Sequence, residues 1–303
     1  MLSKKCADKK QQMNKQFIHK IEELAENSIY YQSIINKHGM DALPIEMLNQ
    51  EQITTQKFQI LDKRISPIQA TALYTQRSFS DKDKYELEIP WSYDDMQKIE
   101  RSLFRKRRKW YGISCSDRYC RNHRPGMGNN PFRVLDDIYF SPHNNFISFS
   151  GECGNQNDWE KCLYYMNVFQ PDWICFENNF FKNLWEYIKK YNLLFPQSIK
   201  YAEIRTNICD PVTRYKDLPF VHSVILYDSI MGEIAYECPQ NHFHILDDLV
   251  FVESWPEQNC KQIIATNLSN RVFPLIRYKL PLSTTIEFKH CECGFDGDIL
   301  IMI

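Results

Sequence analysis

The sequence predicts an α/β fold with a partly parallel sheet. Short apolar strands alternate with helical segments between about residues 145 and 228, and this alternation is typical of βαβ units. From about residue 230 onward the pattern changes to strands and turns. Amphipathic helical patterns precede this core, and no internal repeat or low-complexity tract interrupts it.

The N-terminal part is expected to be mostly helical. Residues 10–37 carry apolar side chains at helical spacing, with lysines and glutamates between them. Residues 42–48 predict an extended entry into a short helix, and the polar stretch 76–86 predicts an exposed loop. The segment YELEIPW (85–91) alternates in polarity, so we expect a strand there.

A long helix is predicted over SYDDMQKIERSLFRKRRKWYGI, residues 92–113. Ser92 is a candidate N-cap, and Asp94 and Asp95 follow where carboxylates favour the helix dipole. The basic run RKRRK (105–109) would suit a phosphate or nucleic acid, but no aromatic stacking pattern or second basic patch accompanies it. We therefore expect this run to form the solvated face of the helix.

The core elements follow from apolar patterning. Continuous or alternating apolar runs predict strands, and longer segments with helical periodicity predict helices. The expected strands are 145–150, 172–177, 199–206 and 222–228, and the expected helices are 159–169 and 179–195.

The composition limits the size of the fold and the kinds of partner that we expect. The chain has 303 residues, of which 43% are hydrophobic, enough for one large domain or two modest ones. A net charge of −1 and the lack of long apolar runs indicate neither nucleic acid nor a membrane as partner. The 11 scattered cysteines suit free thiols in a reducing compartment, so we expect a cytoplasmic protein. Only 9 glycines are available for phosphate-cradling loops, and RPGMGNN (124–130) is expected to be a turn.

Two phrases rich in cysteine and histidine form a candidate metal site. They are ECPQNHFHI, with Cys238, His242 and His244, and KHCECG, with His290, Cys291 and Cys293. Thiolate and imidazole are the ligands that zinc prefers, and Gly294 offers the turn that a Cys-x-Cys pair needs. The alternative from spacing alone is a set of buried thiols with two surface histidines.

Several phrases resemble the phenylacetate-CoA ligase family, a branch of the adenylate-forming superfamily of acyl- and aryl-CoA ligases. The most specific are PLIRY (274–278), the EC…H phrase (237–244) and CECG (291–294). Further segments match family segments in the same order, so the resemblance spans nearly the whole chain. These segments are residues 20–35, 87–113, 169–190 and 224–253.

The resemblance implies the large N-terminal domain of an adenylate-forming enzyme, with α/β sheets and a small distorted β-barrel. In the family a mobile C-terminal lid follows, and because the chain ends at Ile303 we expect the lid and its lysine to be absent. We expect three parts. Residues 1–90 would hold a helical segment and a degenerate phosphate-loop region, 91–230 the α/β core with an acyl pocket, and 231–303 a β-rich subdomain with the Cys/His site.

The family's chemistry has two halves. A carboxylate attacks ATP to give an acyl-adenylate, and a thiol, usually coenzyme A, then takes the acyl group. The implied cofactors are ATP with Mg²⁺, and CoA. The family's Tyr-Gly-x-Ser/Thr-Glu motif and its Arg-Tyr-Arg phrase map onto residues 227–231 and 277–279. The resemblance therefore places Tyr227, Ser229, Gly232 and Arg277 in the substrate-binding site.

The sequence departs from the family at the groups that handle ATP. The stretch 75–89, which matches the phosphate loop, has no glycine and carries two aspartates. Met231 stands where a glutamate helps to hold Mg²⁺, and Leu280-Pro281-Leu282 replaces the ribose-binding aspartate. Phe295 replaces an arginine. Since electrostatic stabilisation dominates phosphoryl chemistry, we predict no ATP-dependent adenylation by this chain alone and name no catalytic residue.

The resemblance also narrows the metal ligands to Cys238, His244, Cys291 and Cys293. These positions look like a zinc site in some family members, and HFHI overlays a family phrase that ends in Leu-His-Ile, which favours His244 over His242. Four protein ligands leave no position for water, so the expected zinc is structural.

Three functions fit this resemblance. The first is a degenerate homologue, a pseudoenzyme that binds or handles an acyl or aryl group, a CoA thioester, a carrier protein or a ligase partner. The second is an ATP-independent acyltransferase that uses Arg277 or a free cysteine. The third is an AMP-forming acyl- or aryl-CoA ligase that works with a separate lid subunit. A gene product without a present role is the remaining alternative.

Overall fold

The computed structural model describes most of the chain from the N-terminal helices onward. The described residues are 19, 21–38, 50–65, 74–78, 87–123, 138–141, 145–150, 156–256, 261–283, 285–295 and 297–301. The segments 42–48 and 124–130, for which a helix entry and a turn are expected, lie outside them.

The chain divides into two compact units. The first comprises Met1–Glu100, Leu246–Ile286 and Met302–Ile303, and the second comprises Arg101–Ile245 and Glu287–Ile301. Each unit therefore contains chain segments far apart in sequence. The three-part division at residues 90 and 230 stays a prediction.

The first unit contains helices and two small antiparallel sheets. The hairpin β1–β2 is one sheet, and β11, β12 and β13 form the other in that order. Its elements are α2 (Ile29–His38), α3 (Gln50–Ile60), β1 (Tyr74–Ser78), β2 (Leu87–Trp91), β11 (Val250–Pro256), β12 (Lys261–Asn267) and β13 (Tyr278–Ser283). Two elements cross the boundary between the units, α5 (Tyr93–Tyr111) and β14 (Thr285–Lys289).

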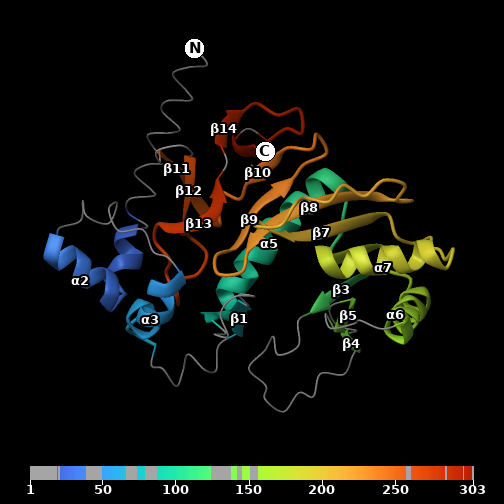
Figure 1. The fold of residues 1–303 in the computed structure, drawn as a ribbon, viewed down its shortest axis with the longest axis horizontal. Coiled ribbons are helices and arrows are strands. Elements are labelled where there is room, and N and C mark those ends of the chain that lie inside the picture. The colour runs from blue at the N-terminus through green and yellow to red at the C-terminus, as the bar shows by residue number, and fades with distance from the viewer. Residues whose placement is uncertain are drawn as a thin grey trace. The chain divides into compact units, whose positions relative to one another are not determined.

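The second unit is built on a large mixed sheet. The ten strands of this sheet run in the order β14-β15-β10-β9-β8-β7-β6-β3-β5-β4 (Figure 1). Its other elements are β3 (Tyr119–His123), β4 (Ile138–Ser141), β5 (Phe146–Ser150), α6 (Gln156–Phe169), β6 (Trp173–Glu177), α7 (Asn178–Lys190), β7 (Tyr201–Asn207), β8 (Val221–Asp228), β9 (Gly232–Glu237), β10 (Phe243–Ile245) and β15 (Gly297–Ile301).

The centre of this sheet is parallel, as the sequence predicts. The strands β5, β3, β6, β7 and β8 pair in parallel. The pairs β4–β5, β8–β9, β9–β10 and β10–β15 are antiparallel. Residues 173–176 of β6 are all buried, which is typical of a parallel strand covered on both faces. The helices α6 and α7 lie beside each other next to this parallel part (Figure 1).

Local sequence explains the two long helices. The Ser92 hydroxyl accepts a hydrogen bond from the Asp95 N–H at 3.1 Å, which confirms the predicted N-cap of α5. In α7 the side chains of Phe180, Phe181, Leu184 and Ile188 are buried, so one apolar face packs on the sheet.

The structure differs from the predicted elements in three boundaries and in two strands that were missed. The N-terminal helical region is interrupted at Asn27 and Ser28, where Ser28 forms an isolated bridge with Asp62. Strand β1 occupies residues 76–78 of the predicted loop, because pairing with β2 outweighs its polar composition. Helix α7 ends at Lys190 rather than at residue 195. Strands β3 and β4 were not predicted from the sequence.

The basic run of α5 is only partly solvated, which corrects a prediction. Arg105, Arg108 and Lys109 are exposed, but Lys106 and Arg107 are buried. The Arg107 guanidinium donates two hydrogen bonds to the Glu203 carboxylate, at 2.7 and 2.6 Å. A helix-face prediction misses such a pair because Glu203 lies on β7, far away in sequence.

Among the described residues, no helix has both the length and the apolar character needed to cross a lipid bilayer.

Candidate functional site

A hairpin turn after β9 presents three possible metal ligands. The Asn241 N–H donates to the Cys238 carbonyl, and the Cys238 N–H donates to the His242 carbonyl, each at 2.9 Å. Asn241 supplies the left-handed backbone of the turn, with φ of 58°. Cys238 and His242 therefore face each other across the turn, and His244 follows on β10, fully buried.

A second turn presents Cys291 and Cys293 beside this hairpin. The Gly294 N–H donates to the Cys291 carbonyl at 3.0 Å, and Gly294 has φ of 76°, which confirms the turn predicted there. Strand β15 then pairs with β10, placing Ile299 opposite His244. The sheet thus brings a C-terminal segment to the hairpin.

The ligand atoms of these two turns converge. The Cys238 and Cys291 sulfurs are 3.7 Å apart, the His242 Nδ1 is 3.2 Å from the Cys291 sulfur, and the Cys293 sulfur is 3.4 Å from the His244 Nε2. The ligand atoms of Cys238, His242, His244 and Cys291 all lie within 4.8 Å of one another. We call Cys238, His242, His244, Cys291 and Cys293 the Cys/His cluster.

The donor set and spacing fit zinc. Zinc binds thiolate at about 2.3 Å and imidazole at about 2.0–2.1 Å with tetrahedral geometry, so neighbouring ligand atoms should be about 3.3–3.8 Å apart. The three separations given above, 3.7, 3.2 and 3.4 Å, are at or within about 0.1 Å of that range. Of the three histidines in these phrases, His244 is buried, His242 is half-buried and His290 is exposed.

Without a cation, burial disfavours thiolates in this cluster. Burial raises the pKa of Cys238, and the neighbouring Cys291 raises it further. Burial, with the thiols of Cys291 and Cys238 nearby, raises the pKa of Cys293 to about 12. Burial and the nearby Lys289 ammonium lower the pKa of His242. A divalent cation would reverse this balance, because metal-bound thiols are deprotonated.

At the other end of β9, residues 228–232 form another turn, which contains the predicted binding residues Ser229 and Gly232. The Asp228 Oδ1 accepts hydrogen bonds from the N–H groups of Ile230 and Met231, both at 2.8 Å. Gly232 closes the turn with φ of 85°, a conformation that favours glycine. Asp228 and Met231 are buried, and Ser229 is half-buried. We call residues 228–232 the Asp228 turn.

Tyr227 lies just before this turn, at the carboxyl edge of the parallel strands. Its hydroxyl donates to the Glu177 carboxylate at 2.6 Å, and Glu177 ends the parallel strand β6, which is separated from β8 by β7. Arg205 of β7 completes the group, since its guanidinium lies 3.6 Å from the Glu177 carboxylate and 2.7 Å from that of Glu233. Burial would lower the pKa of Arg205, but the two carboxylates raise it. The strand ends thus carry a connected polar group.

Arg277 belongs to the first unit and is held within it. Its N–H donates to the Thr266 hydroxyl at 3.0 Å, and its guanidinium donates to the Glu253 carboxylate at 2.9 Å. Strand β13 starts at the next residue and continues through Leu280-Pro281-Leu282. Leu280 is fully buried.

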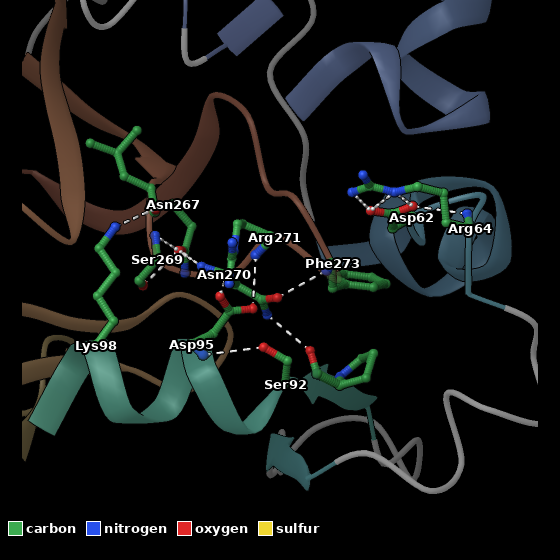
Figure 2. Close-up of polar contacts among 12 residues, drawn as sticks. Asp62, Arg64, Ser92, Asp95, Lys98, Asn267, Ser269, Asn270, Arg271 and Phe273 are labelled. Carbon is green, nitrogen blue, oxygen red and sulfur yellow. Dashed lines mark hydrogen bonds and ion pairs between the residues drawn. The ribbon is translucent and has the colours of Figure 1, made fainter. Parts of the chain in front are cut away.

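The loop that leads to Arg277 is fixed on the start of α5 (Figure 2). The Asp95 carboxylate accepts hydrogen bonds from the Arg271 N–H at 3.1 Å and from its guanidinium at 2.9 Å. The Asn270 amide donates to the Pro90 carbonyl at 2.9 Å, and the Asn267 side chain accepts from the N–H groups of Ser269 and Asn270. Side chains of the first unit therefore hold this loop in place without a ligand.

Three of the four predicted metal ligands, Cys238, His244 and Cys291, lie with His242 so that their ligand atoms are within 4.8 Å of one another. The predicted ligand Cys293 is not in that set, and its sulfur lies 3.4 Å from the His244 Nε2. Tyr227, Ser229 and Gly232 share one segment, whereas Arg277 is in the other unit. The only sequence signal for His242 was the Cys-x3-His-x-His spacing, which offers both histidines.

No protein-family model matches the sequence, and no curated protein matches it either. Solved structures do match. An open conformation of 2-hydroxyisobutyryl-CoA ligase, in complex with 2-HIB-AMP and CoA, has a TM-score of 0.71 at 10% identity over 97% of this chain and 69% of that chain.

The same ligase matches in two further states. Its thioesterification state, with 2-HIB-AMP and CoA, has a TM-score of 0.68 at 12% identity over 97% of this chain and 67% of that chain. Its postadenylation state with 2-HIB-AMP has a TM-score of 0.69 at 11% identity over 97% of this chain and 66% of that chain. This chain thus spans about two thirds of that ligase's length. The chain has the fold of the N-terminal domain of the adenylate-forming CoA ligases.

Proposed function

We propose that this chain is a non-adenylating member of the adenylate-forming fold that binds an acyl or aryl group as a CoA or carrier-protein thioester, and that a structural zinc ion stabilises it. The observation that carries the proposal is the Asp228 turn. There a buried methionine stands where the family's Mg²⁺ ligand is expected, and the turn's own carboxylate is used on backbone N–H groups.

The Asp228 turn is poorly suited to hold Mg²⁺. Mg²⁺ requires hard oxygen ligands in near-octahedral geometry, and a thioether is soft. Asp228 is the acid within this turn, but its Oδ1 already accepts two hydrogen bonds and its side chain is buried. Burial raises its pKa, while the N–H groups of Met231 and Ile230 oppose the rise. These features support binding without adenylation.

The polar group around Tyr227 supports an acyl-binding role. Ligands of open α/β sheets bind outside the carboxyl ends of the parallel strands, and Tyr227, Glu177 and Arg205 lie at those ends. The matched ligase is described in complex with 2-HIB-AMP and CoA, which suggests an acyl thioester as the ligand class here. We propose Tyr227, Ser229 and Gly232, which all lie in the second unit, as the wall of the acyl site.

The Cys/His cluster supports a structural zinc site. Cys238, His244 and Cys291 would hold the ion, with His242 or Cys293 as the fourth ligand, and the ion would then tie the turn after β9 to the segment before β15. Both lie in the second unit, so the ion would fix the C-terminal segment on the edge of the sheet. With four protein ligands, no open position is left for chemistry.

Calorimetric titration tests the proposed binding. Zinc-loaded protein is titrated with 2-hydroxyisobutyryl-CoA, with phenylacetyl-CoA and with ATP·Mg²⁺. We expect saturable binding of at least one thioester and none of ATP·Mg²⁺. Tyr227→Ala should weaken thioester binding at least about tenfold, the effect of losing about 1.4 kcal/mol. The matched control is Val221→Ser, an exposed position at the opposite end of the same strand, which should bind as the wild type does.

The other functions predict different results. ATP–pyrophosphate exchange in the presence of 2-hydroxyisobutyric acid or phenylacetic acid would support an AMP-forming ligase that works with a separate lid subunit. A covalent acyl adduct in the intact mass after incubation with a thioester would support the acyltransferase. Absence of thioester binding by the folded, zinc-loaded protein would overturn the proposal.

A further inference from the structure

The polar group at the carboxyl ends of the parallel strands carries an excess of negative charge. It comprises Glu177, Arg205, Tyr227 and Glu233, which all lie in the second unit. Two carboxylates and one guanidinium give the group a formal net charge of −1. Tyr227 and Glu233 directly precede and follow the Asp228 turn in the chain. We call these four residues the strand-end group.

The carboxylate of Glu177 offers a hydrogen-bond acceptor that no described residue uses. Its Oε2 accepts a hydrogen bond from the Tyr227 hydroxyl at 2.6 Å. Its other oxygen, Oε1, lies 3.6 Å from the Arg205 Nε, which is too far for a hydrogen bond. The Glu177 side chain is 24% exposed, so a ligand at the strand ends can reach this oxygen.

The donors of the strand-end group are used inside it. The Tyr227 hydroxyl has one proton, and it donates that proton to Glu177. The Arg205 Nη2 donates to the Glu233 carboxylate at 2.7 Å, and the Arg205 Nε is buried. The guanidinium carbon lies 5.2 Å from the centre of the Tyr227 ring. The arginine is therefore held within the group, and the Glu177 Oε1 is left as an acceptor beside an excess of negative charge.

A hydrogen-bond donor on the ligand would complete this arrangement. A hydroxyl or an ammonium can donate to the Glu177 Oε1, and a hydrogen bond to an ionised group is roughly twice as strong as a neutral one. A carboxylate on the ligand would meet a like charge and leave this oxygen without a donor.

We infer that the strand-end group makes the site selective for thioesters whose acyl group carries a hydroxyl or an ammonium, and selective against those that carry a carboxylate. Glu177 determines this selectivity, because its carboxylate supplies the open acceptor. The inference rests on the acyl site proposed above and names the class of acyl group that this site takes.

Calorimetric titration of the folded full chain with matched thioesters tests the selectivity. β-Alanyl-CoA, 3-hydroxypropionyl-CoA, propionyl-CoA and malonyl-CoA have acyl groups of equal length that end in an ammonium, a hydroxyl, a methyl and a carboxylate. Two further pairs place a hydroxyl on a branched and on an aromatic acyl group. They are 2-hydroxyisobutyryl-CoA with isobutyryl-CoA, and 4-hydroxyphenylacetyl-CoA with phenylacetyl-CoA.

In at least one of these sets, the thioester with a donor should bind about tenfold tighter or more than its partner without one, the effect of one hydrogen bond to a charged group. Malonyl-CoA should bind most weakly of its set, because it brings a second negative charge to the site.

Two conservative variants assign the selectivity to the strand-end group. Glu177→Gln keeps an oxygen acceptor and removes the charge, so the ratio of the affinities for β-alanyl-CoA and malonyl-CoA should fall about tenfold or more. Glu233→Gln leaves the contact between Tyr227 and Glu177 intact and should lower the same ratio. The matched control is Glu186→Gln, which removes an exposed carboxylate of α7 and should keep the wild-type ratio. A general structural defect would weaken both thioesters alike and leave the ratio unchanged.

Affinities that agree within about twofold across every set would overturn the inference, as would tightest binding of malonyl-CoA. A ratio for Glu177→Gln equal to that of Glu186→Gln would overturn it as well. If circular dichroism shows that Glu177→Gln does not fold, the ratio for Glu233→Gln decides. Folded wild-type protein that binds none of these thioesters would refute the acyl site itself, and the selectivity with it.

Discussion

The two ends of strand β9 carry turns of similar build and opposite chemistry. At one end, the turn between Cys238 and His242 directs soft donors toward other soft donors 3.2 to 3.7 Å away. At the other, the Asp228 turn directs its hard carboxylate oxygen onto its own backbone and buries a methionine. Gly232 and Glu237 are the two ends of the six-residue strand β9, so both turns depend on one strand.

The difference teaches which metal chemistry this fold can support here. A turn binds an ion only if its donors remain available after the turn's own N–H groups are satisfied. In the Asp228 turn, the Asp228 carboxylate accepts hydrogen bonds from the turn's own N–H groups. In the turn between Cys238 and His242, main-chain carbonyls accept those hydrogen bonds, so the cysteine and histidine side chains remain available for a metal ion. We therefore expect the second unit to keep a soft-metal site without an Mg²⁺ site.

The largest expected effect comes from disturbing the strand between the turns. Tyr236 of β9 donates to Glu203 at 2.8 Å, and Glu203 is buried against Arg107. Glu203→Gln should lower the free energy of unfolding by about 3–5 kcal/mol, because it leaves a buried guanidinium without its counter-charge. Denaturant unfolding of Glu203→Gln beside Tyr236→Phe, which loses only one hydrogen bond, measures the effect. A loss below about 1 kcal/mol would mean that the pair does not hold the strand.

This effect should depend on pH. Burial alone would raise the pKa of Glu203, but Arg107 and the surrounding hydrogen bonds lower it below its ordinary value. The stabilisation is therefore present above the unfolded pKa of about 4.3 and is lost as pH falls through the lower folded pKa. The difference between wild type and Glu203→Gln should be constant near neutrality and shrink in acid. If the difference in stability between wild type and Glu203→Gln increased in acid, the pKa of Glu203 would not be lowered in the folded protein.

Removing the proposed zinc ion should lower the stability of the protein through the turn between Cys238 and His242 and leave the Asp228 turn unchanged. Cys238→Ala should abolish stoichiometric zinc and cost about 3 kcal/mol of stability at free zinc about a hundredfold above its Kd. A chelator should produce the same loss in the wild type. Cys115→Ala, an exposed cysteine outside the cluster, is the control and should change neither zinc content nor stability. Equal losses in both variants would indicate a general effect of removing thiols.

Adding a carboxylate to the Asp228 turn tests whether this turn can be made to bind Mg²⁺. Met231→Glu should destabilise the protein by about 2 kcal/mol, because a carboxyl group would be buried without a partner. It should not create ATP·Mg²⁺ binding. Met231→Leu conserves volume and should cost less than about 1.5 kcal/mol. Restored ATP·Mg²⁺ binding in Met231→Glu would show that one missing oxygen ligand, not the turn's geometry, prevents nucleotide binding.

The smallest expected effect is a gain in stability, which we expect from Asp228→Asn. Burial raises the pKa of Asp228, so its stabilising contribution is greatest below the unfolded pKa of about 3.9 and is lost as pH rises through the folded pKa. Asp228→Asn keeps an oxygen acceptor for the turn and removes the buried charge. It should be more stable than the wild type at pH 7 by no more than about 1 kcal/mol, and equal to it near pH 3. Thermal unfolding at both pH values measures this, and Asp228→Ala should lose stability at each.

Sequence predicted what local chemistry determines. The Ser92 cap of α5, the apolar strand β6 and the glycine turn after Cys293 each follow from a few neighbouring residues. It did not predict contacts between distant segments. Arg107 looked solvated because its partner Glu203 is 96 residues away, and the Tyr227 contact with Glu177 depends on strand order. The spacing of the residues in the sequence could not show whether His242 or His244 is the metal ligand, because the fold brings both histidines to the cluster.

The most direct test of the central claim is a titration of the purified chain with ATP·Mg²⁺ after its metal content has been measured. The comparison of the two turns predicts one equivalent of bound zinc and no saturable heat from ATP·Mg²⁺. Saturable, stoichiometric binding of ATP·Mg²⁺, accompanied by pyrophosphate exchange with a carboxylic acid, would contradict it.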